Sequence, residues 1–207
     1  MKLEVRRDGA VGKKQMKLLI ETMVELSLHT GELSDELFEM LCEREVFDRA
    51  VLIGLTLLSY GDNTQKTLER KMIQRGIPRN VATEAVNKLS ECGYIPEDDI
   101  ALRYAAARAD AGWGRNMVIS YLREKGIDVS SCEAVKRYLD DFDFTESGVK
   151  ALILRYGKRI PAGRGENGDA SEKSAFLQKA AGYLFRRGFS RDEIREAIRL
   201  WIKRATP

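Results

Sequence analysis

The chain has 207 residues, of which 32% are charged and 43% hydrophobic, and its formal net charge is +3. The mixed signs are typical of solvated helical surfaces and argue against a disordered chain. No apolar run approaches the roughly 18–20 residues that span a bilayer. The N-terminal residues MKLEVRRDG also lack the apolar core of a signal peptide. We therefore expect a cytoplasmic protein.

Charge is distributed unevenly along the chain. Residues 150–207 contain 14 Lys/Arg and 6 Asp/Glu, a net of +8, which leaves −5 for residues 1–149. The basic end would be attracted to a polyanion or to an acidic protein surface. Cys42, Cys92 and Cys132 form no C-x-x-C pair, so we expect neither disulfides nor a zinc site. We interpret all three as buried or half-buried hydrophobic residues.

The first 45 residues differ in pattern from the rest of the chain. Lys2–Arg7 alternates apolar with charged residues, Asp8-Gly9 is a turn signal, and Lys17–Ile20 suits a second strand. Together they predict a β-hairpin, although Met16–Leu28 also suits a helix. We expect a small N-terminal β-hairpin/helix element over residues 1–45.

One helix is predicted to begin inside this element and another just after it. Ser34 suits an N-cap, because acidic residues occupy the next two positions in the first turn. From residue 47 to residue 58 the sequence predicts an apolar helix whose inward stripe is Val51, Leu55 and Leu58. Asn63 or Thr64 then caps the next helix.

One spacing pattern occurs three times in the remainder, around Gly76, Gly126 and Gly188. Four residues before each glycine stand Met72, Leu122 and Leu184, and directly before it Arg75, Lys125 and Arg187. Directly after it stand Ile77, Ile127 and Phe189; nine residues after it Ala85, Val135 and Ala197; and thirteen after it Leu89, Leu139 and Trp201. Five matched columns in three copies indicate an internal repeat.

Each copy predicts a helix, a tight turn and a returning helix. Apolar residues at i and i+4 give the first helix an inward stripe. The glycine suits the left-handed cap just past its end. The basic residue before the glycine lies at the negative end of the helix dipole, which is its simplest role. With the helix that precedes each copy, we predict an all-α protein of tandem three-helix-bundle repeats.

The predicted repeats cover residues 46–93, 94–143 and 144–207. In the second, a helix opens after Pro96 with Ile100, Tyr104 and Ala107 as its stripe. Further capping boxes are predicted at Ser130 with Glu133 and at Ser190 with Glu193. A glycine-rich loop at residues 157–171 interrupts the third repeat.

Three stretches, Val51–Ile77, Gly93–Ile127 and Leu177–Ile198, resemble the RecX family of bacterial recombinase regulators in order and spacing, and Leu19–Leu41 resembles the N-terminal segment of some members. The resemblance implies an elongated, curved array of modules that is not an enzyme. It also implies binding to the RecA filament on single-stranded DNA and suppression of strand exchange and coprotease activity. We expect a monomer. The context would be homologous recombination, DNA repair and the SOS response. The sequence departs from the family at residues 61–63, where members usually carry a basic residue.

Basic side chains on exposed helix faces are the candidate partner-binding or DNA-binding residues, because a curved array of them could grip a phosphate backbone or an acidic rim. They are Arg70, Lys71, Arg75, Arg103, Arg108, Arg115, Arg123, Arg155, Lys158, Arg159, Arg186 and Arg187. Many would equally serve as solubilising charge. Trp113, in a glycine-flanked turn, is a further candidate for stacking or anchoring, with packing beneath the turn as the alternative. Trp201 is predicted in the core.

Other motifs favour ordinary structural roles. Gly163–Gly168 spells GxGxxG but lacks a preceding strand, so no cofactor is expected. His29 has no catalytic neighbours in the sequence, and Asp140–Asp143 suits a solvated turn better than a metal site. With no P-loop, triad or paired-carboxylate signature, we expect neither an enzyme nor a bound metal. The hypotheses that remain are a regulator of the RecA filament, a direct nucleic-acid binder and a general helical adaptor.

Overall fold

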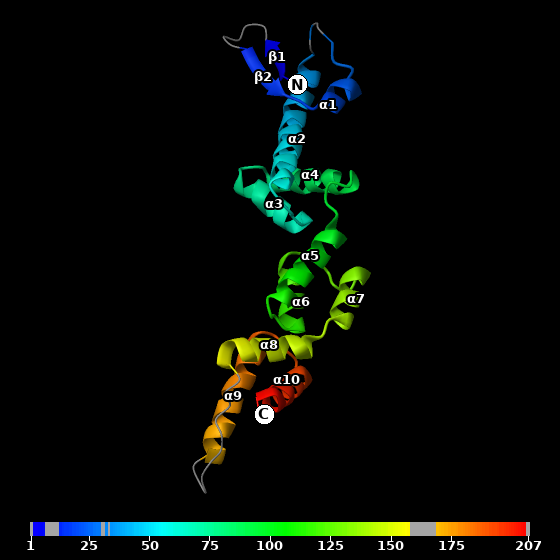
Figure 1. The fold of residues 1–207 in the computed structure, drawn as a ribbon. Helices are drawn as coiled ribbons and strands as arrows, with labels where there is room; N and C mark the ends of the chain where they lie inside the picture. Colours follow the sequence, from blue (N-terminus) through cyan, green and yellow to red (C-terminus); the bar gives the residue numbers. More distant parts are fainter. Residues whose placement is uncertain (1, 7–12, 30–31, 33, 158–168, 206–207) are drawn as a thin grey trace. The chain divides into compact units, whose positions relative to one another are not determined.

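The computed structural model describes residues 2–6, 13–29, 32, 34–157 and 169–205. These residues form ten α-helices and two short strands (Figure 1). The chain divides into two compact units, Met1–Pro96 and Glu97–Pro207. The all-α class predicted from the sequence is confirmed. None of the described helices is both long and apolar enough to cross a membrane.

The first unit begins with an antiparallel pair of strands. β1 (Lys2–Arg6) pairs with β2 (Lys13–Lys17). The sequence predicts the second strand at Lys17–Ile20, which is wrong because β2 ends where that segment starts and α1 (Ile20–Glu25) follows. The predicted turn at Asp8-Gly9 lies outside the described residues.

α2 (Asp35–Ser59) is one continuous helix of 25 residues. Its N-cap is Ser34, as predicted, and the Ser34 hydroxyl accepts a hydrogen bond from the Leu37 amide at 3.2 Å. The predicted boundary between residues 45 and 46 therefore falls inside a helix. Neither glycine nor proline stands between residues 35 and 53, so no local signal ends the helix earlier.

In the second half of α2 the inward face lies on a different side of the helix from the predicted stripe; it consists of Ala50, Val51, Gly54 and Leu57. Of the predicted residues only Val51 is buried, whereas Leu55 and Leu58 are half-buried. Gly54 explains the difference. A Cβ atom there would lie 2.5 Å from Cδ1 of Leu89 in α4 (Arg79–Glu91), so the two helices approach too closely for a larger side chain.

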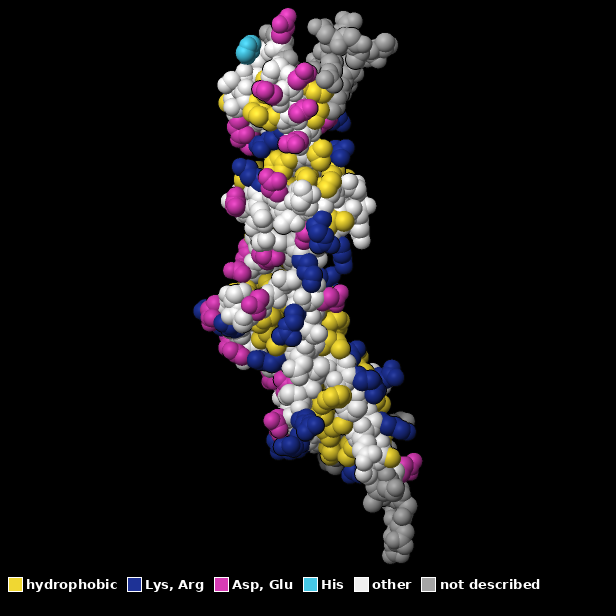
Figure 2. Space-filling view, turned by 180° about the vertical axis from the view of Figure 1, so that it is seen from behind, with side chains coloured by type: hydrophobic (Ala, Val, Ile, Leu, Met, Phe, Trp, Pro, Cys, Tyr) yellow, Lys and Arg dark blue, Asp and Glu magenta, His cyan; other side chains and the backbone are white. Residues whose placement is uncertain are grey.

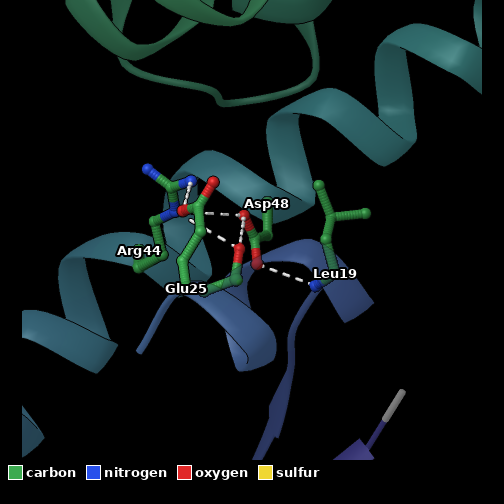
Figure 3. A network of polar contacts seen from close by, with 5 residues as sticks. Leu19, Glu25, Arg44 and Asp48 are labelled. Atoms are coloured by element: carbon green, nitrogen blue, oxygen red, sulfur yellow. Dashed lines mark hydrogen bonds and ion pairs between the residues drawn. The ribbon is translucent and has the colours of Figure 1, made fainter. Parts of the chain in front are cut away.

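A buried carboxylate joins α1 to α2 (Figure 3). Asp48 is fully buried and accepts hydrogen bonds from the Leu19 amide at 2.7 Å and the Thr22 hydroxyl at 3.0 Å. Arg44 lies 3.6 Å from the Asp48 carboxylate and donates to Glu25 at 2.9 Å. Because a buried charge is stable only when it is hydrogen-bonded and paired, this network holds α1 in place on α2.

α3 (Gln65–Gln74) and α4 complete the first unit. Thr64, and not Asn63, is the N-cap of α3; its hydroxyl accepts a hydrogen bond from the Thr67 amide at 3.2 Å. Both helices pack against the inward face of α2.

The second unit contains six helices: α5 (Glu97–Asp110), α6 (Arg115–Glu124), α7 (Glu133–Asp141), α8 (Phe144–Tyr156), α9 (Asp169–Arg186) and α10 (Arg191–Ala205). Their inward side chains form one continuous hydrophobic core that extends from Ala101 in α5 to Trp201 in α10. The second and third predicted repeats therefore share a core. The division of the chain into three repeats stays a prediction.

The repeat columns occupy matching places in the structure. The apolar residues of four columns are buried in all three copies: Met72, Leu122, Leu184, Ile77, Ile127, Phe189, Ala85, Val135, Ala197, Leu89, Leu139 and Trp201. The three repeat glycines have φ angles of +82°, +88° and +84°. In each copy the amide after the glycine donates to the carbonyl five residues earlier, at 3.0–3.2 Å. These are glycine C-caps, so the predicted helix ends are confirmed.

Two predictions in α5 and α7 are wrong. In the predicted stripe of α5, Ile100 is buried and Tyr104 half-buried, but Ala107 is exposed; the rest of the buried face is made by small residues at positions 101, 105 and 109. The Ser130 hydroxyl bonds the Asp128 carboxylate at 2.7 Å, and Cys132 is the N-cap of α7, so there is no capping box with Glu133.

The predictions for the other capping box and for two of the three cysteines are confirmed. The capping box of Ser190 and Glu193 is confirmed, with its two bonds at 2.6 Å and 3.2 Å. All three cysteines are free; Cys132 is buried and Cys42 half-buried as predicted, but Cys92 is exposed.

Candidate partner-binding surface

Three of the candidate basic residues lie on or just after α3 in the first unit. Arg70 and Arg75 are exposed, and Lys71 is half-buried. The Lys71 ammonium donates to the side-chain oxygen of Asn63 at 2.5 Å. Lys71 therefore helps to hold the turn between α2 and α3 as well as carrying a charge.

In the second unit, Arg108 of α5 stacks against two aromatic rings. Its guanidinium carbon lies 5.0 Å from the ring centre of Trp113 and 4.4 Å from that of Tyr121, and it donates to the Tyr121 hydroxyl at 3.2 Å. The Lys125 ammonium lies 5.1 Å from the centre of the same Tyr121 ring. Trp113 is half-buried and meets Tyr121 edge-on at 5.8 Å. Its described contacts are therefore those of packing beneath the turn.

Arg187, just after α9, binds the end of α5. Its guanidinium donates to the backbone carbonyls of Ala111 at 3.2 Å and Gly112 at 3.0 Å. Its own carbonyl accepts a hydrogen bond from the Gly114 amide at 2.7 Å. A Cβ on Gly114 would lie 2.3 Å from the carbonyl carbon of Gly188, so these two turns touch only because neither glycine has a side chain.

Tyr183 of α9 lies beneath a second pair of arginines. The guanidinium carbon of Arg187 lies 5.1 Å from its ring centre, and that of Arg155 in α8 lies 5.8 Å from it. Tyr183 is held edge-on by Tyr156 at 5.9 Å. A cation over an aromatic ring gains about 0.5–1 kcal/mol at exposed sites, and a stacked guanidinium keeps its edge donors for other acceptors.

These residues form what we call the arginine–aromatic surface: Arg108, Trp113, Tyr121, Lys125, Arg155, Tyr183 and Arg187. Its two halves meet where Arg187 binds Gly112, the neighbour of Trp113. Figure 2 shows hydrophobic and basic side chains next to one another on one face of the second unit. Stacked, partly immobilised arginines are suited to bind carboxylate or phosphate oxygens.

The remaining candidates lie outside this surface. Arg115 donates to the carbonyl of Leu139 and, at 2.7 Å, to the Asp140 carboxylate, so it ties α6 to the end of α7. Three others are exposed on α5, α6 and α9: Arg103, Arg123 and Arg186. Lys158 and Arg159 lie outside the described residues, as does the GxGxxG stretch.

The sequence reasoning missed the two tyrosines. Tyr121 and Tyr183 each stand directly before an apolar repeat residue and four residues before the basic one. Residues at that spacing are neighbours on a helix surface, so the signal was present as a sixth repeat column. In the first copy the same place is taken by Lys71.

An ion pair joins α8 to α10 elsewhere in the second unit. Both guanidinium nitrogens of Arg204 donate to the Glu146 carboxylate, at 2.9 Å and 2.8 Å. These hydrogen bonds, followed by the coulombic attraction of Arg204, lower the pKa of Glu146.

Metal-binding and histidine-based chemistry find no support in the part of the chain that the structure describes. There, no group of three or more His, Cys, Asp or Glu residues is placed to hold a metal ion. His29 is exposed, and its Nδ1 lies 3.0 Å from the Ser27 carbonyl oxygen. Asp143 caps α8 by accepting from the Glu146 amide at 2.8 Å, which leaves Asp140 to its ion pair with Arg115.

The fold and the surface define a class: an all-α protein that carries a partly exposed basic–aromatic surface. No protein-family model matches the chain. It is 33% identical over 148 residues to the regulatory protein RecX of Stenotrophomonas maltophilia (strain R551-3), covering 70% of this chain and 83% of that one. It is 31% identical over the same length to the regulatory protein RecX of Xanthomonas axonopodis pv. citri (strain 306). The chain belongs to the RecX family of regulatory proteins.

Solved structures agree with this assignment at the level of the fold. A crystal structure of a regulatory protein RecX matches with a TM-score of 0.70 at 19% identity, covering 88% of this chain and 86% of that one. The crystal structure of RecX from Lactobacillus salivarius matches with a TM-score of 0.58 at 25% identity, covering 76% of this chain and 97% of that one.

Proposed function

We propose that this chain binds the RecA filament on single-stranded DNA and inhibits or modulates its recombinase and coprotease activities, without catalysis of its own. The observation that carries the proposal is the arginine–aromatic surface, in a chain that belongs to the RecX family. The protein would act in the cytoplasm as a monomer.

The geometry supports binding to a repeating polymer. Arg108 is restrained by two rings, and Arg187 by two carbonyls and one ring. Side chains that are already restrained lose less conformational entropy on binding. A filament presents the same acidic and polar groups at regular intervals, so many modest contacts would add up, and no single substitution should abolish binding.

The test is a titration of the protein against RecA on single-stranded DNA, followed by DNA-dependent ATP hydrolysis. We expect inhibition at stoichiometric ratios, and a several-fold weaker effect for Arg155→Gln. Arg199→Gln is the matched control, because Arg199 is exposed and already paired with Glu196. Absence of inhibition at every ratio would reject the proposal.

A second candidate function is direct binding to nucleic acid. The observation that favours it is the exposure of two basic side chains, Arg155 above the Tyr183 ring and Arg186 on α9. Phosphate contacts release counterions, so DNA affinity without RecA should fall steeply with salt. A flat salt response, or no binding to DNA alone, would exclude this function.

A further inference from the structure

One tyrosine of α6 carries two cations against its ring. Tyr121 meets Tyr104 of α5 edge-on, with ring centres 5.8 Å apart, so packing fixes the orientation of its ring. The guanidinium carbon of Arg108, also from α5, lies 4.4 Å from the Tyr121 ring centre. The Lys125 ammonium, at the end of α6, lies 5.1 Å from the same point. We call these four residues the Tyr121 site.

The helices α8 and α9 repeat this arrangement around Tyr183. Tyr183 of α9 meets Tyr156 of α8 edge-on at 5.9 Å. Arg155, also from α8, and Arg187, just after α9, lie 5.8 Å and 5.1 Å from the Tyr183 ring centre. We call these four residues the Tyr183 site. In both sites a tyrosine of the second helix is braced by a tyrosine of the first helix and holds one cation from each, so the arrangement recurs with the fold.

The positive charge of the two sites is not neutralised by neighbouring side chains. The ion pairs that the structure describes in the second unit use five other bases: Arg115, Lys136, Arg195, Arg199 and Arg204. Arg108, Arg155 and Arg187 have no acidic partner among the described residues.

The charge that remains at each site can be estimated. Each site holds two cations at the ends of two helices, α5 and α6 or α8 and α9. Each helix end contributes roughly half a negative charge, so about one positive charge remains at each site. That charge is enough to attract one carboxylate.

The charge of the whole second unit favours carboxylates over a run of phosphates. Its described residues contain 18 Lys/Arg and 16 Asp/Glu, so the unit has little long-range positive potential. A nucleic-acid strand carries one phosphate about every 3.4 Å and is held by many cations in a row. Here the cations lie in two separate pairs. A guanidinium held over a ring also keeps its edge donors for a carboxylate, which it can bind through two parallel hydrogen bonds.

Arg187 connects the two sites. It belongs to the Tyr183 site, and it donates to the Gly112 carbonyl at 3.0 Å, in the turn that also carries Trp113. The Trp113 ring centre lies 5.0 Å from the guanidinium carbon of Arg108, in the Tyr121 site. The Gly114 amide donates to the Arg187 carbonyl at 2.7 Å, which joins the backbones of the two turns. The sites are therefore held at one separation, so a partner bound at one site has a high effective concentration at the other.

We infer that the Tyr121 site and the Tyr183 site each bind a carboxylate, and that one acidic polypeptide segment occupies both sites at once. The inference rests on the proposed function in that the chain acts by binding a protein; it adds which residues bind and the chemistry that they recognise. Either site alone binds weakly, because it offers about one net charge at a partly exposed position. Both together bind more tightly through effective concentration. The first repeat has Lys71 in the place of the tyrosine and so carries no such site.

The test titrates the full chain with two unstructured peptides and follows backbone amide chemical shifts. The one-block peptide has about four glutamates followed by about 20 Gly/Ser residues, and the two-block peptide has a second glutamate block at the other end. We expect the one-block peptide to shift the amides of residues 121–126 and 183–188. The two-block peptide should bind about tenfold more tightly or better, whereas a doubled number of blocks by itself gives a factor of only about two.

Each site has a variant that removes its net charge. Arg155→Gln should weaken binding of the one-block peptide severalfold at residues 183–188 and leave binding at residues 121–126 unchanged. Arg108→Gln should do the reverse. Either variant should remove the advantage of the two-block peptide. Arg199→Gln is the matched control and should keep that advantage, because Arg199 is exposed and paired with Glu196.

Three results would overturn the inference. The first is the absence of shifts in either segment, and the second is equal affinity for the one-block and two-block peptides. The third is that oligo(dT) of the same charge shifts both segments as strongly as the two-block peptide, which would identify the sites as phosphate-binding.

A second arm separates the inference from the proposed function by measuring inhibition of the RecA filament with the same preparation. A chain that binds both peptides as expected but does not inhibit the filament would support the inference and reject the proposed function. A chain that inhibits the filament but shows no peptide shifts at residues 121–126 or 183–188 would reject the inference and support the proposed function.

Discussion

The end of the repeat helix carries different surfaces in the two units. In the second unit a tyrosine lies beneath the basic residue that precedes the glycine: Tyr121 beneath Lys125 and Tyr183 beneath Arg187, each at 5.1 Å. In the first unit the tyrosine's place is taken by Lys71, four residues before Arg75. Two cations at that spacing repel each other, and Lys71 bonds to Asn63 instead.

The two units share the backbone conformation of the repeat but differ in the side chains around it. In all three copies the first helix ends in the same glycine C-cap, with φ between +82° and +88°. In the second unit the cations are immobilised on rings, which suits a prepared binding surface. In the first unit Lys71 and Arg75 line an open depression. One backbone repeat therefore carries two different arrangements of basic side chains.

The largest expected effect comes from breaking the contact between the glycine turns of the second unit. In Gly114→Ala the new Cβ would lie 2.3 Å from backbone atoms of Gly188, which cannot move aside as a flexible side chain could. We expect a loss of about 2–3 kcal/mol in the free energy of unfolding, measured by urea denaturation. Gly182→Ala is the control, because its nearest neighbour is the flexible end of Arg186 at 3.4 Å. An unfolding midpoint of Gly114→Ala equal to that of wild type would show that the two turns do not touch in solution.

Removing the arginine that binds the end of α5 should have the next largest effect. Arg187→Met deletes the hydrogen bonds to Ala111 and Gly112 and leaves both carbonyls without that donor. We expect a destabilisation of about 1.5–2 kcal/mol, measured by urea denaturation. Arg186→Met, at an exposed neighbour, should stay within about 0.5 kcal/mol of wild type. If both variants behave alike, Arg187 has no special structural role.

Removing a repeat tyrosine tests whether the rings support the cations. Tyr121→Leu keeps an apolar side chain but loses the stacking of Arg108 and Lys125 and the bond from Arg108 to the hydroxyl. We expect a loss of about 1 kcal/mol in thermal or urea unfolding, together with weaker filament binding. Tyr94→Leu, at an aromatic residue that is 56% exposed, should change neither quantity. If Tyr121→Leu binds the filament as wild type does, the arginine–aromatic surface is not needed for filament binding.

The smallest expected effect concerns pH. Because hydrogen bonds from Arg204 lower the folded-state pKa of Glu146, the pair contributes stability above the ordinary carboxyl pKa of 4.5 and loses it as pH falls through the folded value. The contribution should stay below about 1 kcal/mol, since both side chains are partly exposed. Glu146→Gln should therefore be less stable than wild type at neutral pH, and the two unfolding midpoints should converge in acid. A difference that persists in acid would point to another cause.

Much of the local structure was predictable because it depends on residues close in sequence. The positions of Ser34, Thr64 and Ser190 identified helix starts, and the three repeat glycines identified helix ends. Where the predictions failed, a competing contact was decisive. Gly54 turned the face of α2 toward Leu89, and in α5 Ala101, Ala105 and Ala109 packed inward with Ile100 in place of Ala107.

The candidate surface was predictable only in part. The spacing of the sequence identified candidate basic residues, but it did not show which of them would lie close together in the fold. Arg108, Trp113, Arg155 and Arg187 come together, whereas Arg115 is used by Asp140. Tyr121 and Tyr183 could have been found by reading one more column of the repeat.

The sequence by itself determined the helical class, the glycine-capped helix ends and the columns of buried apolar residues. Helix periodicity and the backbone freedom of glycine act over about one turn or less, so they can be seen in the sequence alone. Only the tertiary structure decided that Arg187 would bind carbonyls 75 and 76 residues away and that Asp48 would be buried beneath α1. Such contacts depend on how closely two helices pack, which is set by side chains distant in sequence.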